Sequence, residues 1–153
     1  MRKHDFAHVL WIGGSVCSGK TSAAKDLASR YGLRIYSFDR AEPFDIFRSV
    51  PERQPNLIRF MAMTDNRCAL WLVATPDCIR QVRTVRGEGV SQATSDPRRA
   101  FENLVAGDVL MAEHIRHEAD RLGLPVVSAD ADSLPGIAAI IERHFASQLP
   151  GVC

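Results

Sequence analysis

One eight-residue segment near the amino end carries residue types that bind phosphate. It matches the pattern G-x-x-x-x-G-K-[ST] at every fixed position and reads Gly14-Ser15-Val16-Cys17-Ser18-Gly19-Lys20-Thr21. Glycines in such a segment let successive backbone N–H groups turn toward phosphate oxygens without a Cβ in the way. We expect Lys20 to reach the β- and γ-phosphates of a nucleotide, and the Thr21 hydroxyl to ligate Mg²⁺. The segment, with Ser22 directly after it, therefore predicts a nucleotide phosphate site.

A strand pattern precedes this segment and a helix pattern follows it, as a phosphate-binding loop requires. The apolar run 8–12 ends in glycines, and residues 20–31 place their apolar side chains on one helical face before Gly32. The positive end of the helix dipole adds to the attraction for an anion. Cys17 lies inside the loop, and we interpret its side chain as a small filler. A redox or alkylation role is the alternative.

Strand-like and helix-like segments alternate along the whole chain, which predicts a single α/β domain over residues 1–153. We expect a three-layer α/β/α fold with a short, mostly parallel sheet and helices on both faces. The expected strands are 8–12, 33–38, 69–74 and 125–129. The expected helices are 20–31, a segment after Pro55, Pro76 to about Val85 with Thr75 as N-cap, Asp96-Pro97 to Leu122, and 134–145 with Ile137, Ile140, Ile141 and Phe145 inward.

Three arginines recur every third residue in the helix expected after Thr75. Arg80, Arg83 and Arg86 would therefore lie on adjacent turns of one face, where their charges repel unless anions neutralise them. A triphosphate is one such partner, because arginines stabilise charge on a transferring phosphoryl group. The alternative is a solvated face on which the arginines pair with Asp77 and Glu88.

The chain resembles the small P-loop kinases of the shikimate-kinase and nucleoside-monophosphate-kinase type. Besides the loop and its helix, the resemblance is carried by Ile35-Tyr36-Ser37-Phe38-Asp39-Arg40 and by Ala69-Leu70-Trp71-Leu72-Val73-Ala74-Thr75-Pro76. More narrowly, the chain is similar to a group of uncharacterised small AAA-type ATPases or kinases, in its Arg86-Gly87-Glu88 turn and its Ser95-Asp96-Pro97…Ala100-Phe101-Glu102-Asn103 stretch. The resemblance implies a P-loop NTPase fold, ATP and Mg²⁺ as cofactors, and a lid over ATP at about 77–95.

The resemblance also implies roles for single residues. Asp39 would orient or deprotonate an acceptor hydroxyl, or contact Mg²⁺ through water. The alternative for Asp39 is a cap or a salt bridge to Arg40. Arg86 would act with Lys20 on the transferring phosphoryl group, while Arg80 and Arg83 would bind the nucleotide. The adenine is expected between the lid helix and residues 130–133.

The middle of the chain departs from the family pattern. Only residues 40–68 are left for the acceptor-binding helices and for a strand of the Walker B type, and no run of four apolar residues ends in Asp there. The predicted function is an ATP-dependent phosphotransferase that transfers the γ-phosphate to a hydroxyl of a small-molecule acceptor. The alternative is a nucleotide-binding module or weak ATPase that has lost its acceptor site.

Composition excludes several other classes of protein. The chain has 153 residues and a formal net charge of +1, so no basic surface is expected for a nucleic acid. No apolar stretch approaches the ~20 residues of a membrane span. The 4 cysteines form no C-x-x-C pair, which favours reduced thiols in the cytoplasm over metal binding. His114 and His117 lie three apart without a third ligand nearby, and we interpret both as surface residues.

Overall fold

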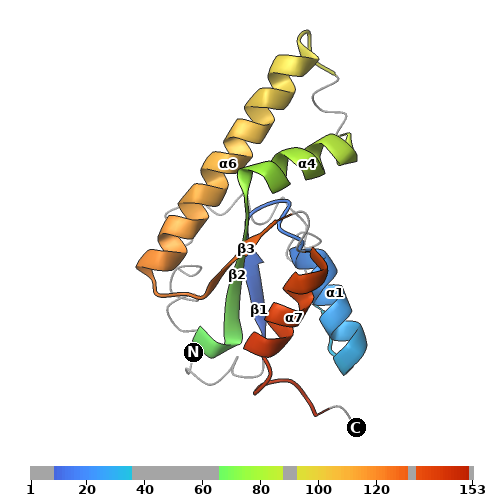
Figure 1. Ribbon diagram of the computed structural model, residues 1–153, viewed down its shortest axis with the longest axis vertical. Coiled ribbons are helices and arrows are strands. Elements are labelled where there is room, and N and C mark those ends of the chain that lie inside the picture. The colour runs from blue at the N-terminus through green and yellow to red at the C-terminus, as the bar shows by residue number, and fades with distance from the viewer. Residues whose placement is uncertain (1–8, 36–65, 88–92, 131–133, 152–153) are drawn as a thin grey trace, which may run out of the picture.

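The computed structural model describes residues 9–35, 66–87, 93–130 and 134–151. Its three strands are β1 (Trp11–Gly14), β2 (Ala69–Ala74) and β3 (Val126–Ala129). They form one parallel sheet in the order β1-β2-β3 (Figure 1). The helices are α1 (Lys20–Tyr31), α4 (Pro76–Arg86), α6 (Pro97–Arg121) and α7 (Leu134–His144), and a short 3-10 turn, η3 (Asn66–Cys68), precedes β2.

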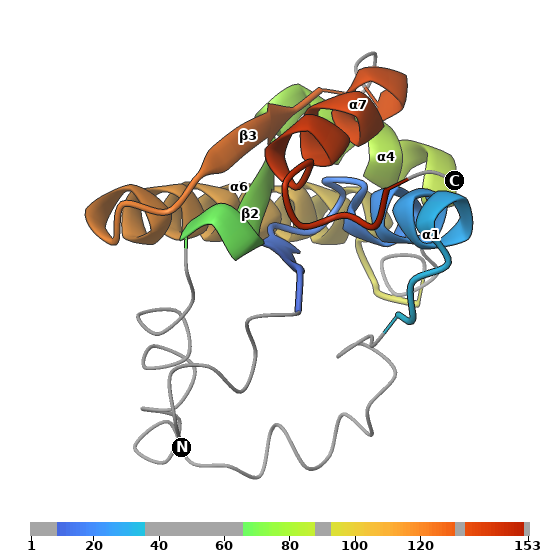
Figure 2. The ribbon, with the colours of Figure 1, turned by 90° about the horizontal axis from the view of Figure 1, so that it is seen from below.

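Helices cover both faces of the sheet because the central strand alternates its side chains. Leu70 and Leu72 of β2 point into a buried cluster with α1 and α7, in which Phe145 is fully buried. Val73 points to the other face, into a second cluster formed with α4 and α6. Figures 1 and 2 show α6 along one side of the strands and α1 and α7 on the other. The expectation of an α/β fold with a parallel sheet and helices on both faces is confirmed.

Capping residues fix the helix boundaries where the sequence predicts them. α1 spans Lys20–Tyr31 and ends at Gly32, which adopts the left-handed conformation that glycine reaches without cost. The Thr75 side chain caps α4 by accepting a hydrogen bond from the backbone N–H of Cys78 at 3.3 Å. The Asp96 side chain caps α6 in the same way, from the N–H of Arg99 at 3.0 Å.

Three details of the sequence prediction are wrong. The first strand begins at Trp11 rather than at residue 8, because its ladder partner in β2 begins at Ala69. Residues 33–35, expected to open the second strand, form no strand. Ile140 was expected inward and is 41% exposed, because α7 packs on the sheet through a narrow stripe spaced by four, Ile137, Ile141 and Phe145.

Other expectations fall outside the described residues. These are the helix after Pro55, residues 36–38 of the second strand, and Asp39. Among the residues that the structure describes, no helix has the length and apolarity needed to cross a membrane.

Candidate phosphate-binding site

The loop Gly14–Thr21 joins β1 to α1, and its first glycine is required by close backbone packing. Gly14 has a φ of 127°, and a Cβ placed on it would lie 1.8 Å from the carbonyl oxygen of Leu72. No other residue type fits there unless the backbone moves. Gly19, at the other end of the loop, also has a positive φ, 79°, and forms the N-cap of α1. The two fixed glycines of the motif therefore shape the entrance and the exit of the loop.

Two buried serines hold the loop in place between these glycines. The backbone N–H of Ser15 donates to the carbonyl of Leu72 at 3.0 Å, and the backbone N–H of Ala74 donates to the Ser15 hydroxyl at 2.8 Å. The Ser18 hydroxyl donates to the Ser15 carbonyl at 2.8 Å. Both side chains are at most 1% exposed. These bonds fasten the loop to the carboxyl end of β2, so its backbone is fixed before any ligand arrives.

The Lys20 ammonium lies over this loop. Lys20 is the first residue of α1, and its Nζ donates to the Ser15 carbonyl and lies 3.5 Å from the Ser18 hydroxyl. Gly19 supplies no side-chain cap, and the first turn of α1 contains no acidic residue. The ammonium and the positive end of the helix dipole therefore act at the same place. The Thr21 and Ser22 side chains are exposed on this turn, and Val16 is 40% exposed at the tip of the loop.

An open cleft of about 550 Å³ adjoins the loop. Its lining includes Cys17 and Gly19 from the loop, Ser22 from α1, and Arg86 from the end of α4. The start of α7 closes the cleft on another side through Ile137. The cleft is large enough for a nucleoside, and it opens beside the end of the loop where α1 begins.

The structure separates the three arginines of α4. The Arg80 guanidinium makes two hydrogen bonds to Glu102 of α6, at 2.9 and 2.7 Å, and this pairing lowers the pKa of the Glu102 carboxyl. The Nε of Arg83 lies 2.7 Å from Asp108 of α6, and the two side chains are only 11% and 14% exposed. Arg86, in contrast, lines the cleft. Arg86, predicted to act on the transferring phosphoryl group, therefore lines the cleft beside the loop, whereas Arg80 and Arg83, predicted to bind the nucleotide, join α4 to α6.

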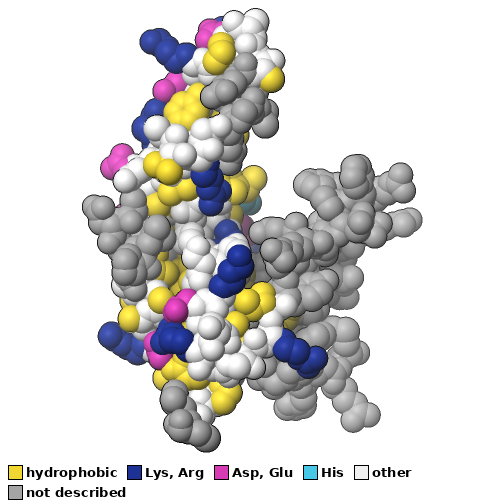
Figure 3. All heavy atoms as spheres, turned by 90° about the vertical axis from the view of Figure 1, so that its right-hand side faces the viewer, with side chains coloured by type: hydrophobic (Ala, Val, Ile, Leu, Met, Phe, Trp, Pro, Cys, Tyr) yellow, Lys and Arg dark blue, Asp and Glu magenta, His cyan; other side chains and the backbone are white. Residues whose placement is uncertain are grey.

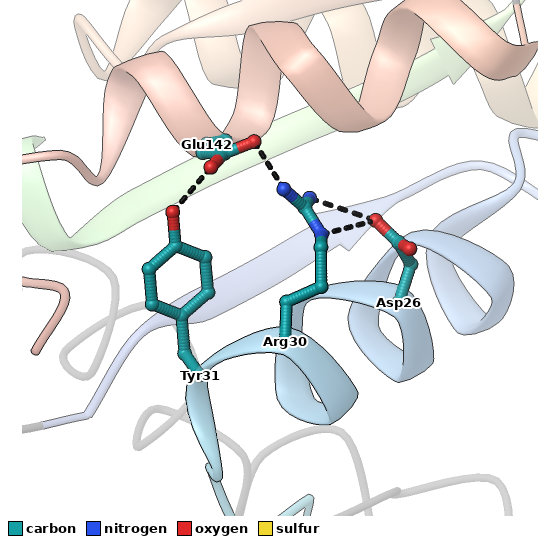
Figure 4. A network of polar contacts seen from close by, with 4 residues as sticks. All are labelled: Asp26, Arg30, Tyr31 and Glu142. Carbon is teal, nitrogen blue, oxygen red and sulfur yellow. Dashed lines mark hydrogen bonds and ion pairs between the residues drawn. The ribbon is translucent and has the colours of Figure 1, made fainter. Parts of the chain in front are cut away.

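A network between α1 and α7 borders the far end of the cleft (Figure 4). Arg30 bonds Asp26 one turn earlier, at 2.7 Å, and also bonds Glu142 of α7. Glu142 accepts a second hydrogen bond from the Tyr31 hydroxyl. The bonds from Tyr31 and Arg30 lower the pKa of Glu142, and the bond to Glu142 raises the pKa of Tyr31. The Asp26–Arg30 spacing could have been noticed in the sequence, but nothing there linked it to Glu142.

One hydroxyl of the loop fits a Mg²⁺ ion bound to a nucleotide. The exposed Thr21 hydroxyl in the first turn of α1 lies where the motif requires a metal ligand, while Asp39, the predicted acidic partner, is outside the described residues. No group of three or more His, Cys, Asp or Glu side chains that could hold a metal occurs within the described ranges. Magnesium on a nucleotide needs only one or two protein oxygens, so the loop fits the ion through Thr21.

Charge on the face that carries α1 and α7 is mixed. Figure 3 shows Lys and Arg side chains scattered over the described part of this face, with Asp and Glu among them, rather than one continuous basic patch.

Comparisons with protein-family models, with curated proteins and with solved structures found no match for this chain. The geometry of the loop and its cleft is therefore the basis for any functional assignment.

Proposed function

We propose that the protein binds ATP at the loop Gly14–Thr21 and transfers its γ-phosphoryl group to a hydroxyl of a small-molecule acceptor, within a P-loop NTPase fold. One observation carries the proposal. The Lys20 ammonium lies over a prebuilt loop of backbone groups at the positive end of α1, and Cys17 and Gly19 of the same loop line an open cleft of about 550 Å³. An anion with a bulky organic group attached fits both features at once.

Each residue of the site has a role in this proposal. The loop backbone from Gly14 to Gly19 and the Lys20 ammonium hold the β- and γ-phosphates. Thr21 and Asp39 hold Mg²⁺, which when bound neutralises phosphate charge. The nucleoside lies in the cleft, against Ser22. Asp39 accepts the proton of the acceptor hydroxyl.

Arg86 lines the cleft and is therefore the arginine that fits the role of a lid residue. Its side chain reaches the same cleft as Gly19, from the opposite element, so it can stabilise charge that develops on the transferring phosphoryl group. We expect Arg86→Ala to slow phosphoryl transfer about tenfold to a hundredfold and to weaken ATP binding far less. Single-turnover rates and ATP affinities, measured side by side, test this. Arg80→Ala is the matched control, because Arg80 pairs with Glu102. Equal losses of rate and affinity in Arg86→Ala would remove the transition-state role.

A second candidate is a nucleotide-binding module or slow ATPase without an acceptor site. The observation that favours it is the pairing of Arg80 and Arg83 with carboxylates of α6, which leaves Arg86 as the one of the three that lines the cleft. With one of these three arginines at the cleft instead of three, a transferring phosphoryl group would be stabilised less in the transition state.

ATP turnover against a panel of small hydroxyl compounds separates the two candidates. A phosphotransferase shows turnover that one acceptor stimulates, that Lys20→Ala abolishes and that Asp39→Asn strongly reduces. Lys25→Ala, which removes the same charge from the second turn of α1, is the control and leaves turnover unchanged. Tight ATP binding without stimulation by any acceptor supports the second candidate.

A further inference from the structure

Two cysteines meet at the floor of the phosphate loop. Cys17 belongs to the loop, and Cys78 belongs to the first turn of α4. They are 7% and 1% exposed and lie in the same buried cluster. The Cys78 thiol lies 3.6 Å from the backbone carbonyl oxygen of Cys17, and neither residue is disulfide-bonded. Two cysteines that are 61 positions apart in the sequence therefore lie next to each other in the fold.

Cys17 has a backbone conformation that a side chain disfavours. Its φ is 61°, and within the described residues it is the one non-glycine with a positive φ. Glycine would adopt this conformation without a penalty, and strained residues of this kind cluster at functional sites. Cys17 also lines the open cleft, so a small molecule in the cleft can reach it. The helix α1 begins three residues later, at Lys20, so Cys17 lies near the positive end of the helix dipole.

Cys78 has the opposite character. Burial raises the pKa of its thiol, and the nearby Cys17 and Asp130 raise it further. Cys78 therefore keeps its proton and reacts second, by attacking a sulfur atom that has already been oxidised. This is the division of work between a thiol at a cleft that is oxidised first and a neighbouring resolving thiol.

We propose that Cys17 and Cys78 form a redox pair that hydrogen peroxide entering the cleft converts to a disulfide. The Cys17 thiolate attacks one peroxide oxygen, the O–O bond breaks, and the leaving hydroxide takes up a proton to become water. Cys17 is then a sulfenic acid. The Cys78 sulfur, giving up its proton, attacks the Cys17 sulfur, the S–O bond breaks, and a second water leaves. Two thiols are oxidised, and one hydrogen peroxide is reduced to two waters. A dithiol reverses the change by thiol–disulfide exchange.

The disulfide would fasten the loop to α4. Its two sulfur atoms must come to about 2 Å, with a fixed dihedral angle, which draws the Cys17 side chain toward Cys78 and shifts the loop backbone. The effect on ATP rests on the proposed function, whereas the formation of the disulfide does not. We expect the oxidised protein to bind ATP at least tenfold more weakly and to recover with dithiothreitol.

Peptide mapping of the full-length protein tests the pair directly. The protein is treated with hydrogen peroxide, alkylated, and digested without reductant. Trypsin leaves Cys17 in the peptide 4–20 and leaves Cys68 and Cys78 together in 68–80, so chymotrypsin is added to cut after Trp71. The expected product links Cys17 to Cys78 and disappears after reduction. Oxidation of Cys17 without this link, or a link from Cys17 to any other cysteine, overturns the proposal.

Cys78→Ala provides the matched variant, and far-UV circular dichroism checks that it folds. Without its resolving partner, Cys17 should proceed to the sulfinic acid, which dithiothreitol does not reverse. Loss of ATP binding on oxidation should then be permanent, whereas in the wild type it is reversible. A reversible loss in Cys78→Ala equal to that of the wild type contradicts the pair. If the linked peptide forms but the reduced protein binds no ATP, the redox pair stands and the proposed function fails.

Discussion

The phosphate loop and the contact between α4 and α6 both hold cationic side chains, but the partners differ. Lys20 donates to a backbone carbonyl and lies beside a hydroxyl, both neutral acceptors. Arg80 and Arg83 bond the carboxylates of Glu102 and Asp108. The ammonium is held within the loop itself, whereas each of the two arginines joins one helix to another. A carboxylate holds its arginine by a charge-assisted hydrogen bond, so a phosphate would gain little by displacing it.

This difference shows what charge spacing in a sequence can and cannot predict. Arg80, Arg83 and Arg86 look equivalent along α4, yet they turn to different surroundings. The distinction lies in α6, whose carboxylates reach α4 only in the folded chain. Lys20 needs no such information, because the loop that positions it is continuous with it in sequence.

The largest effect on stability is expected from a substitution in the phosphate loop. Gly14→Ala places a Cβ 1.8 Å from the Leu72 carbonyl oxygen, so β1 must separate from β2. We expect a loss of about 3–5 kcal/mol in the free energy of unfolding, measured by urea denaturation.

Gly107→Ala is the control, since nothing lies within 4 Å of a Cβ at this position of α6. Removing glycine from a helix interior should raise stability by about 0.5–1 kcal/mol. The two substitutions are therefore predicted to change the free energy of unfolding in opposite directions. A small loss for Gly14→Ala would show that the loop is not held as described.

A smaller effect is expected on the α4–α6 side. Arg83→Ala leaves Asp108 without the guanidinium partner that the largely buried pair provides, which should cost about 2–3 kcal/mol of unfolding free energy. Arg80→Ala should cost clearly less, because its pair with Glu102 is half-exposed. Both are measured by urea denaturation, with ATP affinity as a second measurement. If Arg83→Ala loses more binding free energy for ATP than it loses free energy of unfolding, Arg83 acts at the nucleotide instead.

The smallest expected effect is a dependence on pH. Because Arg80 lowers the pKa of Glu102 in the folded protein, this carboxylate stabilises the fold above the unfolded value of 4.5. That contribution is lost as the pH falls through the lower, folded pKa. The stability difference between wild type and Glu102→Gln should therefore be present at neutral pH and vanish in acid. A difference that is the same at both pH values would show that the ion pair is not its source.

Local signals predicted much of the fold. The cap at Thr75, the cap at Asp96 and the glycine after α1 set helix boundaries because each acts within a few residues of the chain. The start of β1 could not be predicted in this way, because it depends on where Ala69 lies in the neighbouring strand. Ile140 was misplaced because helical spacing alone does not give the width of the buried stripe.

In the candidate site too, the features that lie together in the sequence were predicted, and the contacts between distant segments were not. The glycines, Lys20 and Thr21 were predicted because their chemistry is written in one contiguous motif. The serine bonds to β2, the partners of Arg83 and the contact between Cys17 and Cys78 all join distant segments, and no spacing rule reports them. The roles of Asp39 in catalysis and metal binding stay predictions, because this residue is outside the described ranges.

Titration calorimetry with ATP and Mg²⁺ tests the central claim most directly. The wild type should release heat that fits one site, and Lys20→Ala should weaken the affinity at least about a hundredfold while its urea midpoint stays unchanged. Lys25→Ala should bind as the wild type does. Equal affinities for the wild type and Lys20→Ala, or no heat from the folded wild type, would contradict the claim that this loop holds a nucleotide.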